Sequence, residues 1–323
     1  MRSESEIIRG LQRRFRAGGG VRVGIGDDAA VLAGDRRRDW VVTTDWLIEG
    51  VHFRRQTHPP RAVGWKALAR SLSDLAATAA QPRYALVALA VPSATSARWV
   101  DEFFAGVKAL ADRHGVKLVG GDLSSASQIT IDVQALGVVE RGRAALRRGA
   151  RPGDVLFVSG TLGLSHLGLA ALRRGRAREF RRAVRFHLYP EPRVRLARLL
   201  ARRGVTAMID VSDGLSTDLA HLAEASGVGA RLAADKVPVV RLTAAEERRL
   251  GVTPWALAAN GGEDYELLFT LPPRRAARLP LKLAGVRLTA IGEITRGRGL
   301  ALVGPSGRAR PLSVRGWDHF RRR

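Results

Sequence analysis

The first half of the chain alternates short hydrophobic runs with longer stretches in which hydrophobic residues recur every three or four positions. The short runs predict strands at residues 21–25, 40–44, 84–91 and 128–139, and the longer stretches predict helices at 61–80 and 96–114. Strands that alternate with helices in this way are typical of helices packed on a sheet. We therefore expect one mixed α and β unit from this half.

The second half repeats this mixture. Strands are predicted at 155–159, 207–209, 265–271 and 286–294, and helices at 164–173, 192–203 and 215–225. Between the halves, a basic stretch at 140–151 precedes Pro152-Gly153-Asp154, which is a turn signal. A chain of 323 residues exceeds what one hydrophobic core usually organises. We therefore predict two mixed α and β domains, residues 1–142 and 143–323.

Composition limits where in the cell the protein is expected and which metal ligands it can use. Hydrophobic residues make up 46% of the chain and charged residues 26%, which is typical of a globular protein. No hydrophobic run reaches the roughly 18 residues that cross a bilayer, and the first residues lack the apolar core of a signal peptide. We expect a cytoplasmic protein without a membrane partner. Because the chain has no Cys, any metal must be held by oxygen or imidazole ligands.

A formal charge of +24 raises the question of a nucleic-acid partner. Of the 54 basic residues, five are Lys and the remaining 49 are Arg, scattered among Ala, Gly, Leu and Val. A compositional bias explains this scatter at least as well as a ligand does, so we expect no nucleic-acid partner. In the densest tract, residues 173–185, Ala177, Phe180 and Val184 lie at helical spacing and predict a solvated amphipathic helix.

Four predicted strands end in a carboxylate that Gly, Ser or Thr flanks. These are Asp28 in Gly-Ile-Gly-Asp-Asp, Asp45 in Thr-Thr-Asp, Asp122 in Gly-Gly-Asp and Asp210 in Asp-Val-Ser-Asp-Gly. Each alone is more typical of a turn, but four in one chain favour a shared site. Two unit charges about 4 Å apart repel by about 4 kcal/mol at an effective dielectric near 20, so a shared site needs a cation. Arg could serve, but oxygen ligands without Cys favour Mg²⁺.

Glycines beside these carboxylates indicate what else the site would hold. Gly120 and Gly121 let backbone N–H groups approach an anion, and Gly214 precedes a predicted helix whose N-terminus attracts negative charge. Magnesium sites of this kind are usually completed by substrate phosphates. The residues alone therefore predict a magnesium-dependent enzyme that acts on phosphates.

A set of motifs spans residues 24–320, nearly the whole chain. In order they are Gly-Ile-Gly-Asp-Asp-Ala-Ala at 24–30, Thr-Thr-Asp at 43–45, Glu-Gly-Val-His-Phe at 49–53, Leu-Ser-Asp-Leu-Ala-Ala at 72–77, Gly-Gly-Asp at 120–122, Asp-Val-Ser-Asp-Gly-Leu at 210–215, Gly-Gly-Glu-Asp-Tyr-Glu-Leu at 261–267 and Gly-Trp-Asp-His-Phe at 316–320. This order resembles the thiamine-monophosphate kinases of the aminoimidazole-ribonucleotide-synthetase superfamily. The His-Phe at 52–53 and the motif at 261–267 are specific to the kinase branch.

The resemblance implies a fold, a reaction and an assembly. The implied fold is the two-domain, mixed α+β and α/β architecture of aminoimidazole-ribonucleotide synthetase, with an N-terminal ATP- and metal-binding domain and a C-terminal α/β domain. The implied reaction is direct, in-line phosphoryl transfer from ATP, the co-substrate, to thiamine monophosphate, giving thiamine diphosphate with the help of several Mg²⁺ ions. The implied assembly is a homodimer formed through N-terminal strands.

The resemblance also implies roles for individual residues. The implied magnesium ligands are Asp28, Thr43, Thr44, Asp45, Asp74, Asp122, Asp210 and Asp213. Catalysis through bound metal, without a general base, is implied for Asp45, Asp122 and Asp210. The implied ATP contacts are Gly121, Asp122, Arg147 (with Arg143 and Arg148 as alternatives), Ser212 and, beside the adenine, Phe104. The implied contacts to thiamine monophosphate are His52, Glu263 and Trp317.

Simpler roles remain open for four of these residues. His52 could be a surface histidine, and Trp317 could anchor the end of the chain in the core. Asp74 lies one helical turn from Arg70 and could pair with it, while Glu263 could pair with any of several arginines.

Alternatives also remain for the whole chain. It could be another enzyme of the superfamily, or a basic binding protein whose acidic motifs are vestigial. The absence of Cys argues against selenophosphate synthetase. The motif at 261–267 argues against aminoimidazole-ribonucleotide synthetase and the hydrogenase-maturation dehydratase.

Overall fold

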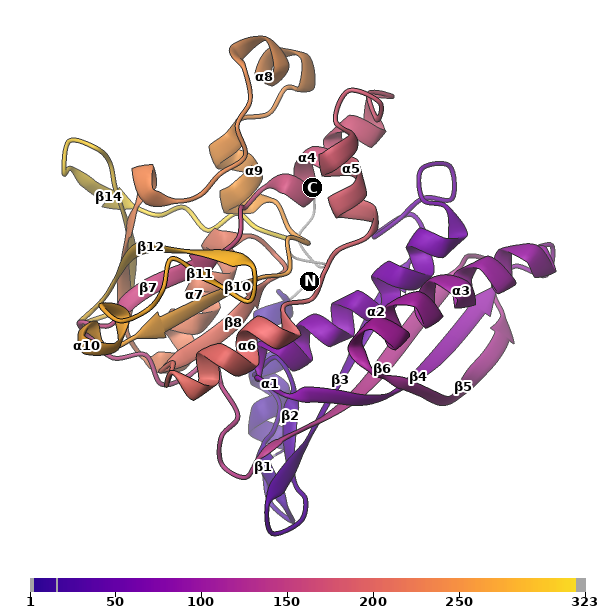
Figure 1. The fold of residues 1–323 in the computed structure, drawn as a ribbon, viewed down its shortest axis with the longest axis horizontal. Helices are drawn as coiled ribbons and strands as arrows, with labels where there is room; N and C mark the ends of the chain where they lie inside the picture. Colours follow the sequence, from indigo (N-terminus) through magenta and orange to yellow (C-terminus); the bar gives the residue numbers. More distant parts are fainter. Residues whose placement is uncertain (1–2, 16, 318–323) are drawn as a thin grey trace.

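Two mixed β-sheets, each covered by helices, account for most of the computed structural model, which describes residues 3–15 and 17–317 (Figure 1). The first sheet uses strands between Val21 and Glu140, and the second uses strands from Val155 onward. The expected mixed architecture with two domains is therefore confirmed. The segment 141–154 connects the two sheets, and the predicted boundary between residues 142 and 143 falls within it.

The N-terminal sheet has six strands in the order β1-β2-β3-β6-β4-β5. Their bounds are β1 Val21–Val23, β2 Ala30–Ala33, β3 Arg38–Ile48, β4 Gln81–Val91, β5 Lys117–Ser125 and β6 Thr130–Glu140. β3 and β6 pair antiparallel along their whole length, from Arg38 opposite Glu140 to Ile48 opposite Thr130. β4 and β5 run parallel, and β5 and β1 form the two edges of the sheet.

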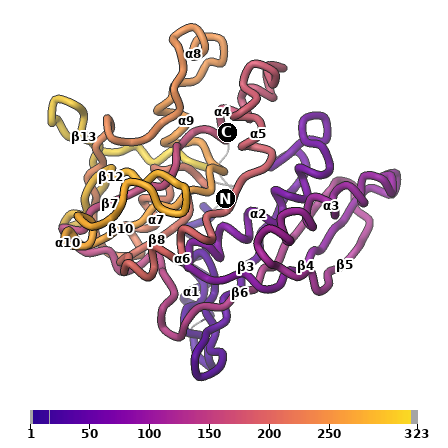
Figure 2. The backbone as a smooth tube through the Cα atoms, in the orientation of Figure 1, coloured from indigo at the N-terminus to yellow at the C-terminus, as the bar shows by residue number. Residues whose placement is uncertain are grey.

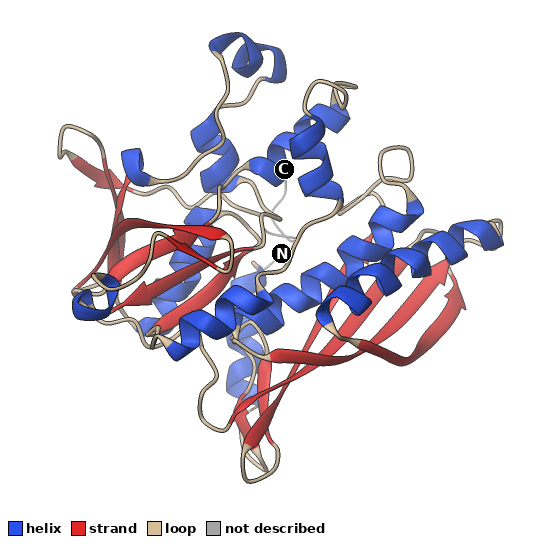
Figure 3. Ribbon diagram, in the orientation of Figure 1, coloured by secondary structure: helices blue, strands red, loops and turns tan. Residues whose placement is uncertain are grey.

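Helices α2 (Pro60–Ala77) and α3 (Ala97–His114) cover one face of this sheet (Figure 3). Alternation along β3 places Val41 and Leu47 in the core beneath them. The opposite face carries Trp40, Trp46 and Tyr84, which are 37%, 53% and 40% exposed. One face of the sheet is thus packed, and the other, which we call the open face, presents aromatic side chains to solvent.

The C-terminal sheet has the strand order β14-β13-β9-β12-β7-β10-β8, with β11 paired to β12. The bounds are β7 Val155–Ser159, β8 Ala207–Val211, β9 Gly229–Ala233, β10 Glu266–Leu271, β11 Lys282–Leu283, β12 Val286–Thr295, β13 Gly299–Val303 and β14 Ala309–Pro311. Its middle strands are buried on both faces. Val158 shares a core with α7 (Leu215–Ser226), and Phe157 shares one with α6 (Val194–Arg202). The continuous hydrophobic runs in these strands reflect this two-sided burial.

Shorter helices complete the described chain. They are α1 Glu4–Arg14, α4 Leu164–Arg173, α5 Arg181–Leu188, α8 Ala244–Leu250, α9 Pro254–Asn260, α10 Pro273–Ala276 and the 3₁₀ helix η1 Ala234–Lys236. Helices α4, α5, α8 and α9 share a small core that includes Leu167, Ala183, Leu250 and Leu257. Within the described ranges, no helix is long and apolar enough to cross a membrane.

Helix α2 connects the two domains, because it packs on α6 and β8 of the C-terminal domain (Figure 2). Ala76 at its C-terminal end shares a core with Leu196 and Leu200 of α6. Nearer its start, the indole Nε1 of Trp65 donates a hydrogen bond to the carbonyl of Pro190 at 2.7 Å. Side chains on this helix therefore lie between the domains.

Two predictions from the hydrophobic pattern are wrong. The tract 173–185 is not one helix, because α4 ends at Arg173, Gly175 has a φ of 67°, and α5 begins only at Arg181. A residue in the left-handed conformation cannot continue a right-handed helix. Asp45 and Asp122 do not end their strands, because β3 and β5 each continue for three more residues.

Candidate active site

One face of α2 carries the charged residues from which the site is built. Lys66, Arg70 and Asp74 recur every four residues and therefore lie along one side of the helix. Asp74 accepts a hydrogen bond from the hydroxyl of Thr43 at 2.6 Å, and Arg70 Nη2 donates to Asp45 Oδ1 at 3.0 Å. Instead of pairing with each other, Arg70 and Asp74 thus contact neighbouring positions of β3.

Three carboxylates from distant segments meet between the domains. Asp28 precedes β2, Asp74 lies on α2 and Asp210 lies on β8, and one oxygen of each lies within 4.8 Å of the other two. Asp28 and Asp210 are 8% and 1% exposed. Ser73 Oγ donates to Asp210 Oδ2 at 2.5 Å, and Arg147 donates to Asp28 Oδ1 from Nε at 3.0 Å and from Nη2 at 2.6 Å. We call these three residues the carboxylate cluster.

The carboxylate cluster holds more negative charge than its neighbours balance, and its pKa values reflect this. Burial, followed by the nearby carboxylates of Asp45, Asp210 and Asp28, raises the pKa of Asp74 well above its usual range. Burial and Asp28 raise the pKa of Asp210 to about 7. Burial also raises the pKa of Asp28 in spite of Arg147. Carboxyl groups in such surroundings take up protons near neutral pH unless a cation neutralises them.

A second acidic group follows β8. Asp213, Asp218 and His221 each place one ligand atom within 4.8 Å of the other two. Burial and Glu4 raise the pKa of Asp213 to about 7. Asp218 Oδ2 accepts backbone hydrogen bonds from Asp213 at 3.2 Å and from the following glycine at 3.0 Å, at the start of α7. Asp218 therefore shapes the loop that presents Asp213.

The oxygen atoms of the carboxylate cluster fit a hard divalent cation. Carboxylate oxygens are preferred ligands of Mg²⁺, and Asp28, Asp74 and Asp210 offer them in one place. A cation there would relieve the repulsion that raises the pKa values and would keep the carboxyl groups ionised. Ser212 adds a further oxygen, since its hydroxyl lies 3.4 Å from Asp210 Oδ1. The arrangement can thus bind Mg²⁺ and, with it, phosphate groups.

One candidate arginine of the segment 143–148 reaches the carboxylate cluster. Arg147 contacts Asp28 through its guanidinium group, and its backbone N–H lies 3.3 Å from both carboxylate oxygens of Asp27. Arg143 instead lines a separate pocket. Arg147 is therefore placed to contact a phosphate group bound beside the carboxylate cluster.

Glu263 lies on the other side of Arg70 and contacts a buried lysine. Lys66, which is 0% exposed, donates from Nζ to Glu263 Oε2 at 2.7 Å, and Arg70 Nη1 lies 3.5 Å from Oε1. Burial alone would raise the pKa of Glu263, but Lys66, His187 and Arg70 together lower it well below its usual range. Its φ of 67° places the backbone in the left-handed region. The domain junction therefore holds one carboxylate that stays ionised.

The next three residues of the same motif hold this loop in place. Asp264 accepts hydrogen bonds from two backbone N–H groups at the start of α4, at 2.6 and 3.0 Å. The Tyr265 hydroxyl accepts a hydrogen bond from Arg70 at 3.3 Å. Glu266 pairs with Arg193, which precedes α6. These three residues thus contact three different elements, and Tyr265, like Glu263, contacts α2 of the N-terminal domain.

Two histidines that sequence reasoning did not identify extend this network. His187 Nε2 lies 3.5 Å from Lys66 Nζ and 3.2 Å from His58 Nε2, and His187 Nδ1 lies 2.9 Å from Ser165 Oγ. Burial, followed by Lys66, lowers the pKa of His187 well below its usual range and that of His58 to about 3. Both rings are therefore neutral at pH 7. Only the four-residue spacing along α2 could have indicated Lys66, and no motif marks the histidines.

The structure places two further predicted substrate contacts on loops. His52 lies in the turn after β3, where Nδ1 accepts a hydrogen bond from the backbone N–H of Ile48 at 3.0 Å. Trp317 donates its backbone N–H to the carbonyl of Asp213 at 3.1 Å, so this segment lies over the start of α7. The rest of that motif, residues 318–320, lies outside the described residues. Trp317 thus lies beside the loop that carries Asp213, whereas His52 is hydrogen-bonded to the end of β3.

Strand alternation turns Thr44 away from the carboxylate cluster. Thr43 faces α2 and donates to Asp74, whereas the hydroxyl of Thr44 donates to Asp132 at 2.5 Å on the open face. The side chain of Thr44 is therefore not among the groups that the structure brings to the carboxylate cluster.

Three predicted ATP contacts lie far from the carboxylate cluster within one chain. Strand pairing leads from Asp45 on β3 across β6 and β4 to Gly121 on β5. Gly121 therefore lies three strand spacings, or about 14 Å, from Asp45. Asp122 follows on β5 opposite Ala88, on the open face of the sheet, and is exposed. Phe104 lies on α3 where this helix contacts the first turns of α2, whereas Asp74 lies near the other end of α2.

Comparison with known proteins identifies the family. The model for "AIR synthase related protein, N-terminal domain" matches residues 26–139, and the model for the corresponding C-terminal domain matches residues 151–304. The thiamine-monophosphate kinase of Synechococcus elongatus is 38% identical over 305 residues, which cover 91% of each chain. That of Aquifex aeolicus is 36% identical over 299 residues, which cover 92% of each chain.

A solved structure agrees with these sequence matches. AaThiL complexed with AMPPCP and TMP superposes with a TM-score of 0.87 at 34% identity, and the match covers 99% of both chains. The similarity therefore extends through both domains and through the segments that carry the carboxylate cluster. On this basis the chain belongs to the thiamine-monophosphate kinase family of AIR synthase related proteins.

Proposed function

We propose that this chain catalyses the ATP-dependent phosphorylation of thiamine monophosphate, producing thiamine diphosphate and ADP. Its relatives are thiamine-monophosphate kinases, and the similar structure of AaThiL holds an ATP analogue together with TMP. The observation that carries the proposal is the meeting of Asp28, Asp74 and Asp210 within 4.8 Å between the domains. Such a group of buried carboxylates is suited to a metal-assisted reaction of phosphates.

Charge repulsion is the main obstacle to this reaction. Two doubly charged phosphate groups about 4 Å apart repel by about 16 kcal/mol at an effective dielectric near 20. Bound Mg²⁺ ions would neutralise this charge, and we propose the following ligands for them: Asp28, Thr43, Asp45, Asp74, Asp122, Asp210 and Asp213. Thr44 would join them only through its backbone oxygen, because its hydroxyl points to the open face. Arg147 would add a fixed positive charge beside them, and Ser212 would offer a hydroxyl to ATP.

The acceptor needs no catalytic base. A phosphate monoester has a second pKa of about 6, so thiamine monophosphate is already ionised at pH 7. The protein then has to position the two reactants in line and to neutralise their charge, which supports direct transfer without a phosphorylated enzyme. For Asp45, Asp122 and Asp210 we propose catalytic roles through bound metal.

Glu263 is the proposed contact for the thiamine part of the acceptor. Thiamine carries a positively charged thiazolium ring, and the side chain of Glu263 is ionised and 18% exposed. Lys66 and Arg70 of α2 pair with its carboxylate group. Trp317, which lies beside the loop that carries Asp213, would offer an aromatic surface to this cation. His52 is the third proposed contact to thiamine monophosphate.

A homodimer would bring the remote ATP contacts to the carboxylate cluster. Asp28 lies beside β1 at one edge of the N-terminal sheet, and Gly121 and Asp122 lie on β5 at the other edge. If two copies pair these edges, β5 of one copy lies beside Asp28 of the other. The exposed aromatic side chains of the open face would be covered in the same assembly. We therefore propose that Gly121, Asp122 and Phe104 serve the site of the second copy.

Subunit mixing tests this homodimer. Asp28→Asn and Asp122→Asn should each be inactive alone, because every site then lacks one carboxylate. In an equal mixture with exchanged subunits, about a quarter of the sites regain both carboxylates, so about a quarter of the wild-type activity should return. A mixture that contains mixed dimers and stays inactive would show that Asp122 serves its own chain.

Product analysis tests the reaction. Incubation with ATP, Mg²⁺ and thiamine monophosphate should give thiamine diphosphate and ADP in equal amounts, separated by chromatography. Free thiamine should give no product, because it lacks the acceptor phosphate, and Asp74→Asn should be inactive with either acceptor. Loss of ATP without thiamine diphosphate would overturn the proposal. We place this reaction in the cytoplasm.

A further inference from the structure

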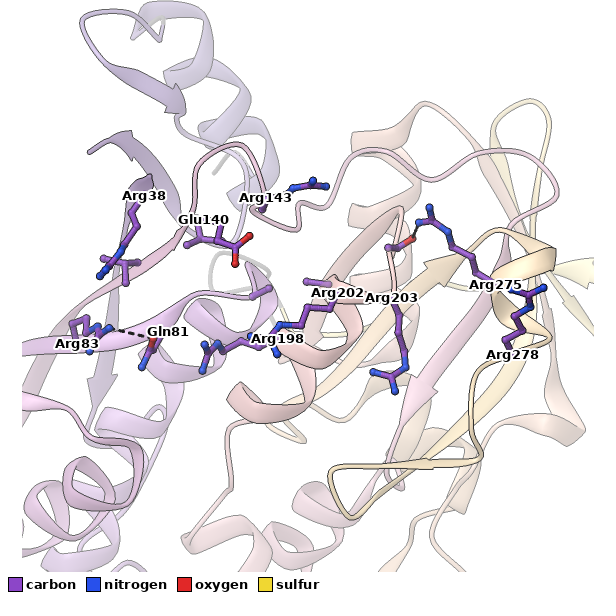
Figure 4. A pocket seen from close by; sticks show the side chains of 15 residues that line it. Arg38, Gln81, Arg83, Glu140, Arg143, Arg198, Arg202, Arg203, Arg275 and Arg278 are labelled. Atoms are coloured by element: carbon purple, nitrogen blue, oxygen red, sulfur yellow. Dashed lines mark hydrogen bonds between the residues drawn. The ribbon is translucent and has the colours of Figure 1, made fainter. Parts of the chain in front are cut away.

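A pocket opens between the domains, away from the carboxylate cluster. It is a pocket of about 820 Å³ lined by fifteen residues, eight of which are arginines and only one of which, Glu140, is acidic (Figure 4). No residue of the carboxylate cluster lines it. We call this site the arginine pocket.

Composition alone does not account for the arginine pocket. The chain has 49 arginines among 323 residues, because five of its 54 basic residues are Lys. At that frequency, fifteen lining residues would include only about two arginines, whereas eight are present. Arginine is thus enriched among the residues that line this pocket.

Both domains contribute arginines to the pocket. Those from the N-terminal domain and the connecting segment are Arg38, Arg83 and Arg143, and those from the C-terminal domain are Arg198, Arg202, Arg203, Arg275 and Arg278. Figure 4 shows Arg198 reaching from α6 toward Gln81 and Arg83 of β4.

The guanidinium groups of the pocket keep most of their hydrogen-bonding capacity. Arg83 donates to the side chain of Gln81, and Arg203 and Arg275 donate to backbone carbonyls. Across residues 3–15 and 17–317, none of the eight guanidinium groups lies within 4.0 Å of a carboxylate oxygen. Eight like charges around one pocket repel one another, and a bound polyanion would relieve that repulsion.

We propose that the arginine pocket binds a polyphosphate, meaning a chain of three or more linked phosphate groups. Guanidinium groups bind phosphate oxygens through paired, charge-assisted hydrogen bonds. The volume lies within the range of about 300–1,000 Å³ that is usual for small-molecule sites, which favours a small polyanion over a long nucleic acid. The phosphates can belong to a nucleoside triphosphate or to inorganic polyphosphate, which share this chemistry.

A bound polyphosphate would also connect the two domains. Arg83 lies on β4 of the first domain, and Arg198 and Arg202 lie one turn apart on α6 of the second. Because α6 packs against α2, a ligand that bridges these elements would hold the domain junction on which the carboxylate cluster depends. Binding should therefore raise the thermal midpoint of the protein.

Calorimetric titration with sodium tripolyphosphate in EDTA tests the proposal. Without metal, the carboxylate cluster repels a polyphosphate, so binding reports on the arginine pocket. Wild-type protein should bind at about 0.15 M salt and more weakly as the salt concentration rises. Arg198→Glu combined with Arg202→Glu should weaken binding more than about tenfold. Unchanged binding in this variant would overturn the proposal.

A control pair separates the pocket from the overall charge. Arg296 and Arg298 are exposed in the turn between β12 and β13, outside the pocket. Arg296→Glu combined with Arg298→Glu changes the net charge equally and should alter the affinity by less than about twofold. An equal loss in both variants would show a general charge effect and overturn the proposal. The circular dichroism spectrum and the unfolding midpoint of each variant without ligand report whether it is folded.

Two further measurements complete the test. Arg198→Gln combined with Arg202→Gln introduces no negative charge, and it should weaken binding less than the Glu pair does. If this milder variant is folded and binds as wild type does, the proposal fails. ATP in EDTA distinguishes the sources, because tighter binding than that of tripolyphosphate identifies a nucleotide. A single-stranded oligonucleotide that binds while tripolyphosphate does not would overturn the proposal in favour of a nucleic-acid surface.

Discussion

The substitution Asp210→Asn tests whether the carboxylate cluster is short of positive charge. Asp210 is 1% exposed, accepts a hydrogen bond from Ser73, and shares the cluster with Asp28 and Asp74. Asparagine keeps the size of the side chain and one acceptor oxygen, but it removes the negative charge. The substitution therefore changes electrostatics with little change in packing.

The pKa of Asp210 sets the size and the pH dependence of the effect. Burial and Asp28 raise it from 3.8 to about 7. A carboxyl group whose pKa is raised by folding contributes stability that is complete below pH 3.8 and is lost as the pH rises through about 7. One pKa unit corresponds to about 1.4 kcal/mol, so the loss between pH 5 and pH 8 is about 2–3 kcal/mol. Asparagine does not titrate and escapes this loss.

Urea unfolding in EDTA at pH 5 and pH 8 measures this difference. The free energy of unfolding of Asp210→Asn, relative to that of wild type, should be higher at pH 8 than at pH 5 by about 2–3 kcal/mol. Asp235→Asn removes an exposed carboxylate on η1 and serves as the matched control, for which we expect no such change. An Asp210→Asn difference that is the same at both pH values would refute the reasoning.

Three further predictions concern the metal, the domain junction and the acceptor. In thermal scans, Mg²⁺ should raise the midpoint of wild type but not that of Asp74→Asn, and equal shifts would count against the metal site. Lys66→Met should lower the free energy of unfolding in urea by about 3 kcal/mol, because Glu263 loses its nearest cation; a change below about 1 kcal/mol would disagree. In steady-state assays, Trp317→Ala should raise the KM for thiamine monophosphate more than kcat falls, and an unchanged KM would remove Trp317 from the acceptor site.

Local patterns predict those parts of the fold that local interactions decide. The helix expected at 164–173 coincides with α4, and the helix expected at 96–114 differs from α3 by one residue. Glycine marks one end of each, since Gly163 precedes α4 and Gly115 follows α3, both in the left-handed conformation. The strands β13 and β14, at one end of the second sheet, were not predicted, because such short segments show no distinct alternation of hydrophobic and polar residues.

Contacts between distant segments explain what the sequence did not predict in the site. The spacing of Arg70 and Asp74 permits an ion pair within α2, but Asp45 of β3 takes the guanidinium group. The separation of Asp122 from the carboxylate cluster follows from the strand order β3-β6-β4-β5, which no local pattern reveals. Lys66 likewise acquires its role only where the C-terminal domain brings Glu263 to α2.

Phosphorus NMR on one sample tests most directly whether the carboxylate cluster works through divalent metal to join two phosphates. Protein, ATP and thiamine monophosphate are observed first in EDTA and then after addition of excess Mg²⁺. We predict no change before the addition. After it, the thiamine monophosphate resonance should give way to the two resonances of thiamine diphosphate, with one ADP formed per conversion. Conversion in EDTA, or ATP hydrolysis that leaves thiamine monophosphate intact, would contradict this assignment.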